Sequence, residues 1–169
     1  MMRDVYIGWD NGGTGSIGII KPHKGESFYS STPTKQCVNY TKERQVITRV
    51  DKPKVMALLE EWVIPEETVF CCLERPLTNP GKYYATVLAA RAFEACIIIL
   101  EELQIEYDVI DSRIWQKDLF PQGTKGEAAL KQASFDIGLQ LFPNLSREII
   151  AQNDADGILI AEYIKRRGI

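Results

Sequence analysis

The sequence has very few of the residues on which most zinc sites and nucleophilic enzymes depend. It contains one histidine, His23, and four cysteines without CxxC spacing among its 169 residues. A zinc site or a disulfide framework is therefore not expected. Catalysis by a Ser-His-Asp or Cys-His arrangement would depend wholly on His23, which stands beside Pro22 in a predicted turn. Carboxylate or lysine chemistry is what remains.

Long apolar runs and an excess of basic residues are also absent. The longest apolar run, residues 95–100, is too short to span a bilayer, and the start MMRDVYIGWD does not resemble a secretory signal. We therefore expect one cytoplasmic domain over residues 1–169, with no membrane partner. The net charge of -3 disfavours nucleic-acid binding. It does not exclude a nuclease, because a cluster of metal-binding acids lowers the net charge while basic residues elsewhere contact phosphates.

Hydrophobic patterning predicts an α/β chain in which strands come before most helices. Strands are expected at residues 5–9, 16–20, 68–73 and 107–110, with weaker candidates at 28–29 and 46–50. Helices are expected at residues 54–62, 82–103, 126–142 and 155–167. The second of these helices is apolar on nearly all sides, which predicts that it is buried. The order of elements describes a mixed sheet flanked by helices.

Three acids stand where predicted elements begin or end. Asp10 follows the first strand, Glu74 follows strand 68–73, and Asp156 opens the last helix. Each has an ordinary interpretation: a turn cap for Asp10, an ion pair with Arg75 for Glu74, and a favourable helix-dipole position for Asp156. Their combination favours a shared divalent-cation site, because hard carboxylate oxygens suit Mg²⁺ or Mn²⁺.

Two such ions, roughly 4 Å apart, would support phosphodiester hydrolysis by activating water and stabilising the leaving 3′ oxygen. Lysines at the scissile phosphate would add charge stabilisation. Lys117 and Lys125 flank the loop PheProGlnGlyThrLysGly, which could present them, although a lysine in such a loop is more often a solvated surface charge.

Taken in order, four segments resemble the RuvC-like Holliday junction resolvases of the ribonuclease-H-like superfamily. IleGlyTrpAspAsnGlyGlyThrGly resembles the first-strand motif, LeuGluArgPro the strand-end glutamate, SerArgIleTrpGlnLys with ThrLysGly the lysine-bearing region, and AspAlaAspGlyIleLeuIleAla the final-helix motif. The resemblance covers most of the chain. It implies a ribonuclease-H-like mixed β-sheet flanked by α-helices.

By position, the resemblance implies that Asp10, Glu74 and Asp156 are metal-binding catalytic acids. It implies that Lys125, or less closely Lys117, lies beside the phosphate. It further implies a homodimer that nicks two strands of a four-way junction symmetrically with Mg²⁺ or Mn²⁺.

One position departs from the family pattern. The bacterial enzymes carry a fourth acid three residues before the last one, and this sequence has Asn153 there, followed by Asp154. If the helix has already begun, Asn153 shares the face of Asp156 and Asp154 turns away. If the helix begins later, Asp154 can reach the metals. Asp154 is favoured because an anion contributes more to a dication than an amide does, and Asn153 remains the alternative neutral ligand.

Other activities are compatible with parts of this pattern. An Asp followed by Gly and Thr also begins the phosphate loop of sugar-kinase and actin-like ATPases, but 169 residues cannot supply their two domains. A ribonuclease H acting on RNA–DNA hybrids shares the metal chemistry, and a catalytically inactive junction-binding protein could keep the fold. The lysine region and the late acids favour a DNA endonuclease that resolves four-way junctions and related branched DNA.

Overall fold

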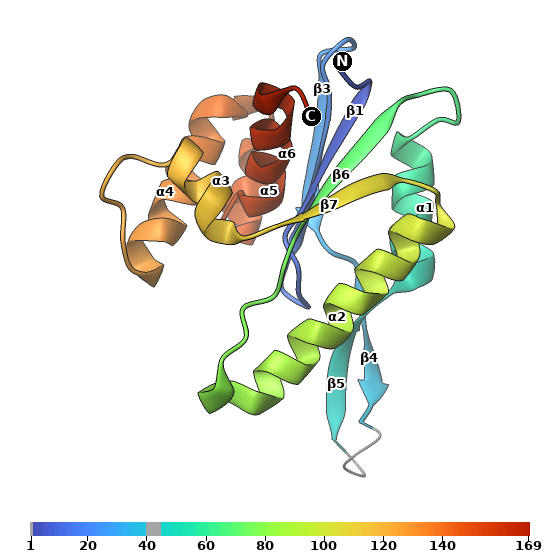
Figure 1. Cartoon of the computed structure of the whole chain (residues 1–169), viewed down its shortest axis with the longest axis vertical. Helices are drawn as coiled ribbons and strands as arrows, with labels where there is room; N and C mark the ends of the chain where they lie inside the picture. Colours follow the sequence, from blue (N-terminus) through green and yellow to red (C-terminus); the bar gives the residue numbers. More distant parts are fainter. Residues whose placement is uncertain (1, 40–44) are drawn as a thin grey trace.

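The computed structural model, which describes residues 2–39 and 45–169, has a five-stranded mixed sheet with helices on both faces (Figure 1). The strand order is β3-β2-β1-β6-β7. The strands are β1 (Val5–Trp9), β2 (Ser16–Lys21), β3 (Glu26–Ser31), β6 (Val69–Glu74) and β7 (Glu106–Ile110). Pairing is antiparallel from β1 to β3 and parallel from β1 through β6 to β7. The predicted α/β class with a mixed, helix-flanked sheet is confirmed.

The helices form one layer on each face of the sheet (Figure 1). One layer contains α3 (Ser112–Leu119), α4 (Glu127–Leu141), α5 (Ser146–Gln152) and α6 (Asp156–Arg167). The other contains α1 (Lys52–Trp62) and α2 (Tyr83–Glu102). Short 3-10 turns at Pro80–Lys82 and Pro143–Leu145 precede α2 and α5. Side chains alternate along β1, so Tyr6 joins the core under α6 while Ile7 joins the core under α1 and α2.

Helix α6 lies in direct backbone contact with the sheet at its first turn. Gly8 and Gly18 are register partners on β1 and β2. A Cβ atom on Gly8 would lie 2.2 Å from the Gly157 carbonyl oxygen, and one on Gly18 would lie 2.2 Å from Ile158 Cα. Both obstacles are backbone atoms, so only glycine fits at these two positions. The start of α6 is therefore held against the strands that lead to Asp10.

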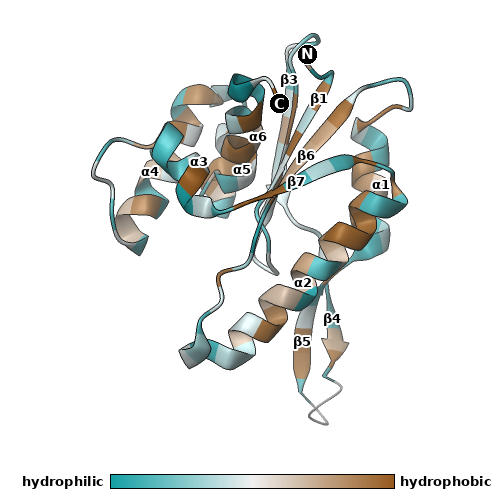
Figure 2. Ribbon diagram, viewed as in Figure 1, coloured by the Kyte–Doolittle hydropathy of each residue, from teal (hydrophilic) through white to brown (hydrophobic). Residues whose placement is uncertain are grey.

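Helix α2 corrects one expectation from the sequence. Its buried residues, Ala92, Cys96, Ile99 and Leu100, begin only at the middle of the helix, so the predicted burial is wrong for residues 83–91. There Tyr83 is 77% exposed, and Figure 2 shows apolar residues along much of the helix. By length and composition alone Pro80–Glu102 could cross a membrane, a test that core helices of soluble proteins also pass.

A two-stranded ribbon, β4 (Thr34–Val38) and β5 (Val46–Val50), runs beside the exposed part of α2 (Figure 1). The sequence did not predict β4, α3 or α5, whereas the other strands and the α-helices lie within two residues of their expected bounds. Helix α3 is only 8 residues long and begins where the Asp111 side chain accepts a hydrogen bond from the Arg113 N–H at 2.9 Å.

Candidate functional site

Carboxylates gather at the sheet edge where the parallel strands β1, β6 and β7 end. Trp9 pairs with Leu73, so Asp10 and Glu74 occupy neighbouring strand ends, one just past β1 and one as the last residue of β6. Glu74 pairs in turn with Ile110, which places Asp111 at the same edge. The strand-end positions predicted for Asp10 and Glu74 therefore converge as expected.

Ser16, at the start of β2, brings the third acid to this edge. Its Oγ accepts a hydrogen bond from the Gly157 N–H at 3.0 Å, and its carbonyl oxygen accepts one from the Asp10 N–H at 2.9 Å. Ser16 is fully buried. Because α6 begins at Asp156, these two bonds tie the acid end of the helix to the loop after β1.

The charges of the acids act on one another. Burial raises the pKa of Asp10 well above its ordinary value, and the negative charges of Glu74, Asp156 and Asp154 raise it further. Four carboxylates from three parts of the chain therefore share one electrostatic environment. Such a group favours either protonation or a cation, because buried like charges destabilise one another.

Glu74 is not neutralised by the arginine that follows it. Arg75 forms an ion pair with Asp111 at 2.5 Å, and Arg113 pairs with the same carboxylate at 3.0 Å. Hydrogen bonds from Arg113 and Arg75 hold the pKa of Asp111 well below its usual range. Glu74 instead accepts a hydrogen bond from Trp115 Nε1 at 2.7 Å. The interpretation of Glu74 as an ordinary partner of Arg75 is therefore wrong.

Burial also dominates the state of Glu74 itself. Burial is the largest cause, and the charges of Asp156 and Asp111 add to it while the hydrogen bond from Trp115 opposes it, so the pKa of this carboxyl is raised to about 7. A carboxyl of this kind exchanges its proton near neutral pH and is free to lose it to a cation.

The structure brings Asp154, and not Asn153, to the acids. Asn153 is exposed and ends α5 in the left-handed region at φ 60°. Asp154 lies before α6 begins, and its Oδ1 accepts a hydrogen bond from the Tyr29 hydroxyl at 2.7 Å. The charge of Asp154 also raises the pKa of Asp156, after burial has done so. Helix α6 begins only at Asp156, after Asp154. This is the alternative for which the sequence predicted that Asp154 could reach a metal.

A lysine that the sequence did not predict, Lys131, has a charge that lowers the pKa of one of the acids. The positive charge of Lys131 on α4 opposes burial, which raises the pKa of Asp156 to about 6. Ser134, three residues later on the same helix face, donates its hydroxyl to Asp156 Oδ1 at 2.5 Å. Lys117 and Lys125 instead line a separate hollow of about 660 Å³ between α3 and the loop after it, together with Arg113.

The donor chemistry of the acid group fits a hard divalent cation. Asp10, Glu74, Asp154 and Asp156 offer carboxylate oxygens, which are the ligands that Mg²⁺ and Mn²⁺ prefer. Within residues 2–39 and 45–169, no three His, Cys, Asp or Glu side chains are arranged to hold one ion together.

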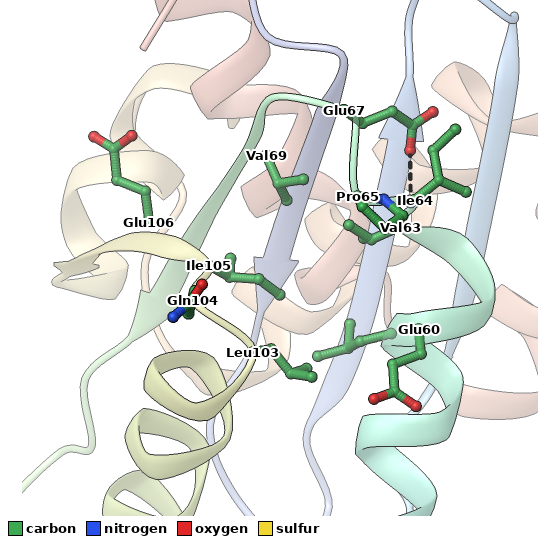
Figure 3. Close-up of a pocket in the computed structure, with 11 residues that line it drawn as sticks. Glu60, Val63, Ile64, Pro65, Glu67, Val69, Leu103, Gln104, Ile105 and Glu106 are labelled. Atoms are coloured by element: carbon green, nitrogen blue, oxygen red, sulfur yellow. Dashed lines mark hydrogen bonds between the residues drawn. The ribbon is translucent and has the colours of Figure 1, made fainter.

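Another hollow, of about 460 Å³, lies at the opposite edge of the sheet, among the end of α1 and the starts of β6 and β7 (Figure 3). Glu67 on its wall accepts hydrogen bonds from Lys21 Nζ at 2.8 Å and from the Ile64 N–H at 3.2 Å, the latter drawn in Figure 3. This hollow contains none of the predicted site residues.

Two solved structures share the fold over nearly the whole chain. One is T. thermophilus RuvC in complex with Holliday junction substrate, with a TM-score of 0.56, 11% sequence identity, and coverage of 97% of this chain and 96% of that one. The other is a Thermus thermophilus RuvC structure, with a TM-score of 0.50, 16% identity and the same coverage. No protein-family model and no curated protein sequence matches the chain. The likeness shows that the fold is RuvC-like.

Proposed function

We propose that this chain with a RuvC-like fold is a structure-selective DNA endonuclease that resolves four-way junctions and related branched DNA by two-metal-ion phosphodiester hydrolysis. The observation that carries the proposal is the convergence of Asp10, Glu74, Asp154 and Asp156 at one sheet edge, seen in their mutual effects on pKa. The T. thermophilus structure with the same fold holds a Holliday junction substrate, which supports this choice of DNA.

The four carboxylates would hold Mg²⁺ or Mn²⁺, as two ions per site. Such ions supply an activated water and stabilise the leaving 3′ oxygen. The chain contributes the anionic cradle itself, because burial and mutual repulsion raise the pKa values of Asp10, Glu74 and Asp156 and would favour a cation beside them. It also contributes Lys131, whose charge already acts on Asp156 and would act equally on a phosphate beside it.

The hollow lined by Arg113, Lys117 and Lys125 is proposed to hold the phosphate backbone of a DNA arm. All three basic side chains belong to exposed residues, and among the residues that the structure describes no acidic one lines the hollow. Phosphate contacts of this kind position a nucleic acid without reading its sequence. Lys125 therefore keeps its expected place beside DNA, with a role in affinity that can be separated from the reaction rate.

Symmetric cleavage of a junction needs two sites, and we propose a homodimer. The exposed apolar residues around the start of α2, Leu77, Tyr83 and Tyr84, supply a face that a second copy could cover. Sedimentation or light scattering should give twice the monomer mass. The double variant Tyr83→Lys/Tyr84→Lys should have the mass of a monomer. A wild-type protein that is monomeric at micromolar concentration would contradict this part of the proposal.

The decisive experiment compares labelled four-way junction, linear duplex and RNA–DNA hybrid, each with Mg²⁺, Mn²⁺ or chelator. Junction should be cut with either metal and remain intact with chelator. Asp10→Asn should abolish cutting while leaving junction binding in place. Linear duplex cut as fast as junction would defeat the structure-selective claim, preferential cutting of the hybrid would indicate a ribonuclease H, and unchanged cutting by Asp10→Asn would overturn the site.

A further inference from the structure

Three acids of the site each accept a hydrogen bond from a neutral side chain on a different element. Trp115 Nε1 on α3 donates to Glu74 Oε2 at 2.7 Å, and the Ser134 hydroxyl on α4 donates to Asp156 Oδ1 at 2.5 Å. The Tyr29 hydroxyl on β3 donates to Asp154 Oδ1 at 2.7 Å. The donor residues are at most 1% exposed.

The neutrality of these donors separates them from the ion pairs nearby. Arg75 and Arg113 satisfy Asp111 with positive charge, which leaves that carboxylate little attraction for a cation. A hydroxyl or an indole N–H fixes the orientation of a carboxylate and leaves its full negative charge available. At this sheet edge, one acid, Asp111, is neutralised by arginines. The other three are oriented by hydrogen bonds from neutral groups.

Each donor occupies one oxygen and leaves the other. The side-chain hydrogen bonds of Glu74, Asp156 and Asp154 in the described part of the chain all go to a single oxygen of each carboxylate. The second oxygen of each group is the one that a cation would take. This division resembles the way carboxylate ligands of metal sites are commonly held by outer hydrogen bonds.

The donors are themselves rigid because they belong to the core under α6. Trp115 packs edge-on against Phe120, with ring centroids 5.3 Å apart. Tyr29 is a member of the same apolar cluster. The Ser134 oxygen also accepts the Ala155 N–H at 3.0 Å, so its hydroxyl hydrogen is directed at Asp156. Because the donors are fixed by packing, their hydrogen bonds also fix the orientation of each carboxylate.

We propose that Trp115, Ser134 and Tyr29 are positioning residues that orient Glu74, Asp156 and Asp154 for divalent-cation binding and thereby set the metal affinity of the site. This inference rests on the proposed function, because it assigns the acids a cation. It adds three residues that act through the carboxylates and make no contact with DNA.

The test measures binding of Mn²⁺ alone to the full-length protein by electron paramagnetic resonance, without DNA. Tyr29→Phe, Ser134→Ala and Trp115→Phe should each weaken Mn²⁺ binding by roughly 10-fold or more, the usual effect of removing an outer hydrogen bond. Tyr107→Phe and Trp62→Phe are the matched controls, since the Tyr107 hydroxyl contacts Glu101 and Trp62 stacks on Phe28, away from the acids. Both controls should bind as the wild type does.

A spectroscopic readout separates positioning from loss of structure. The indole of Trp115 touches a proposed ligand, so Mn²⁺ should change tryptophan fluorescence in the wild type and in Trp62→Phe. The change should be smaller in Trp115→Phe, where only Trp9, next to Asp10, remains close to the site. Melting temperatures measured without metal identify any variant that has lost its fold, and Tyr29→Phe, which removes one oxygen atom, is the variant least exposed to that problem. If all three variants fold and bind Mn²⁺ with the affinity of the wild type, the inference is overturned. If the wild type itself binds no Mn²⁺, the proposed metal site is overturned instead.

Discussion

Gly8 and Gly18 face each other on β1 and β2, and both lie directly beneath the first turn of α6. The contact is between backbones, so the position of Asp156 depends on two residues that have no side chain. The geometry of the candidate site therefore depends partly on these two glycines, which let α6 approach the sheet.

Gly18→Ala should destabilise the protein by about 3 kcal/mol or more, above the usual range for overpacking, because the new methyl group meets backbone 2.2 Å away. Urea unfolding followed by circular dichroism measures the loss. Gly13→Ala is the control, since its Cβ would meet only the Thr48 side chain at 3.4 Å and φ there is not positive. Equal stability of the two variants would show that α6 can move off the sheet at little cost.

Asp154→Asn and Asn153→Gly distinguish the two candidates for the fourth ligand. Asp154→Asn should reduce Mn²⁺ affinity and junction cutting by about 10-fold or more, because the anion among the other acids is replaced by a neutral amide. Asn153→Gly preserves the left-handed backbone at φ 60° and removes the amide side chain. Binding and cutting by Asn153→Gly should match the wild type, and the reverse pattern would return Asn153 to the site.

Lys131→Gln should shift the pH dependence of Mn²⁺ binding and of cutting toward higher pH. The charge of Lys131 lowers the pKa of Asp156, so its removal lets that pKa rise, and a higher pH is then needed to form the carboxylate. We expect a shift of a few tenths to about one pH unit. Lys125→Gln should weaken DNA binding without moving the profile, and a shift in Lys125→Gln alone would exchange the two roles.

Glu67→Gln should lower stability at neutral pH by roughly 1–3 kcal/mol. Burial would raise the pKa of Glu67, but hydrogen bonds from Lys21 and Lys24 outweigh it and lower the pKa from 4.5 to about 2. A lowered pKa stabilises the fold above pH 4.5 and loses that effect as pH falls toward 2. The deficit of Glu67→Gln in urea unfolding should therefore shrink between pH 5 and pH 3.

The adjacent Glu66→Gln provides the comparison for this experiment, because Glu66 is exposed and lies outside the ion pair of Lys21 and Glu67. It should unfold as the wild type does at both pH values. A deficit in Glu67→Gln that stays constant with pH would mean that packing, and not charge, is what Glu67 contributes.

The acids were predictable from the sequence because each is attached to a local pattern. Asp10 and Glu74 follow short apolar strands, and parallel strands end at one edge. The sequence favoured Asp154 over Asn153 by charge alone and kept both candidates, because the spacing argument depends on where α6 begins. A shift of one residue rotates a helical side chain by 100°.

The hydrogen-bond donors could not be found from local patterns. Trp115, Ser134 and Tyr29 are separated from their acids by 41, 22 and 125 residues, and each resembles an ordinary core residue in sequence. The half-exposed state of α2 was missed for a related reason. An apolar helix face looks the same in sequence whether this chain or another molecule covers it.

The pairing of Arg75 with Asp111 has a consequence for the order of events on DNA. Because Arg75 pairs with Asp111, its charge does not offset the acids around Glu74, and in the proposed nuclease those acids would repel a phosphodiester until a cation binds. In the proposed nuclease, a strand can be gripped by the basic hollow near α3 while its scissile bond is kept at a distance. DNA binding and strand cleavage then become separable stages, and cleavage requires that the cation has bound first.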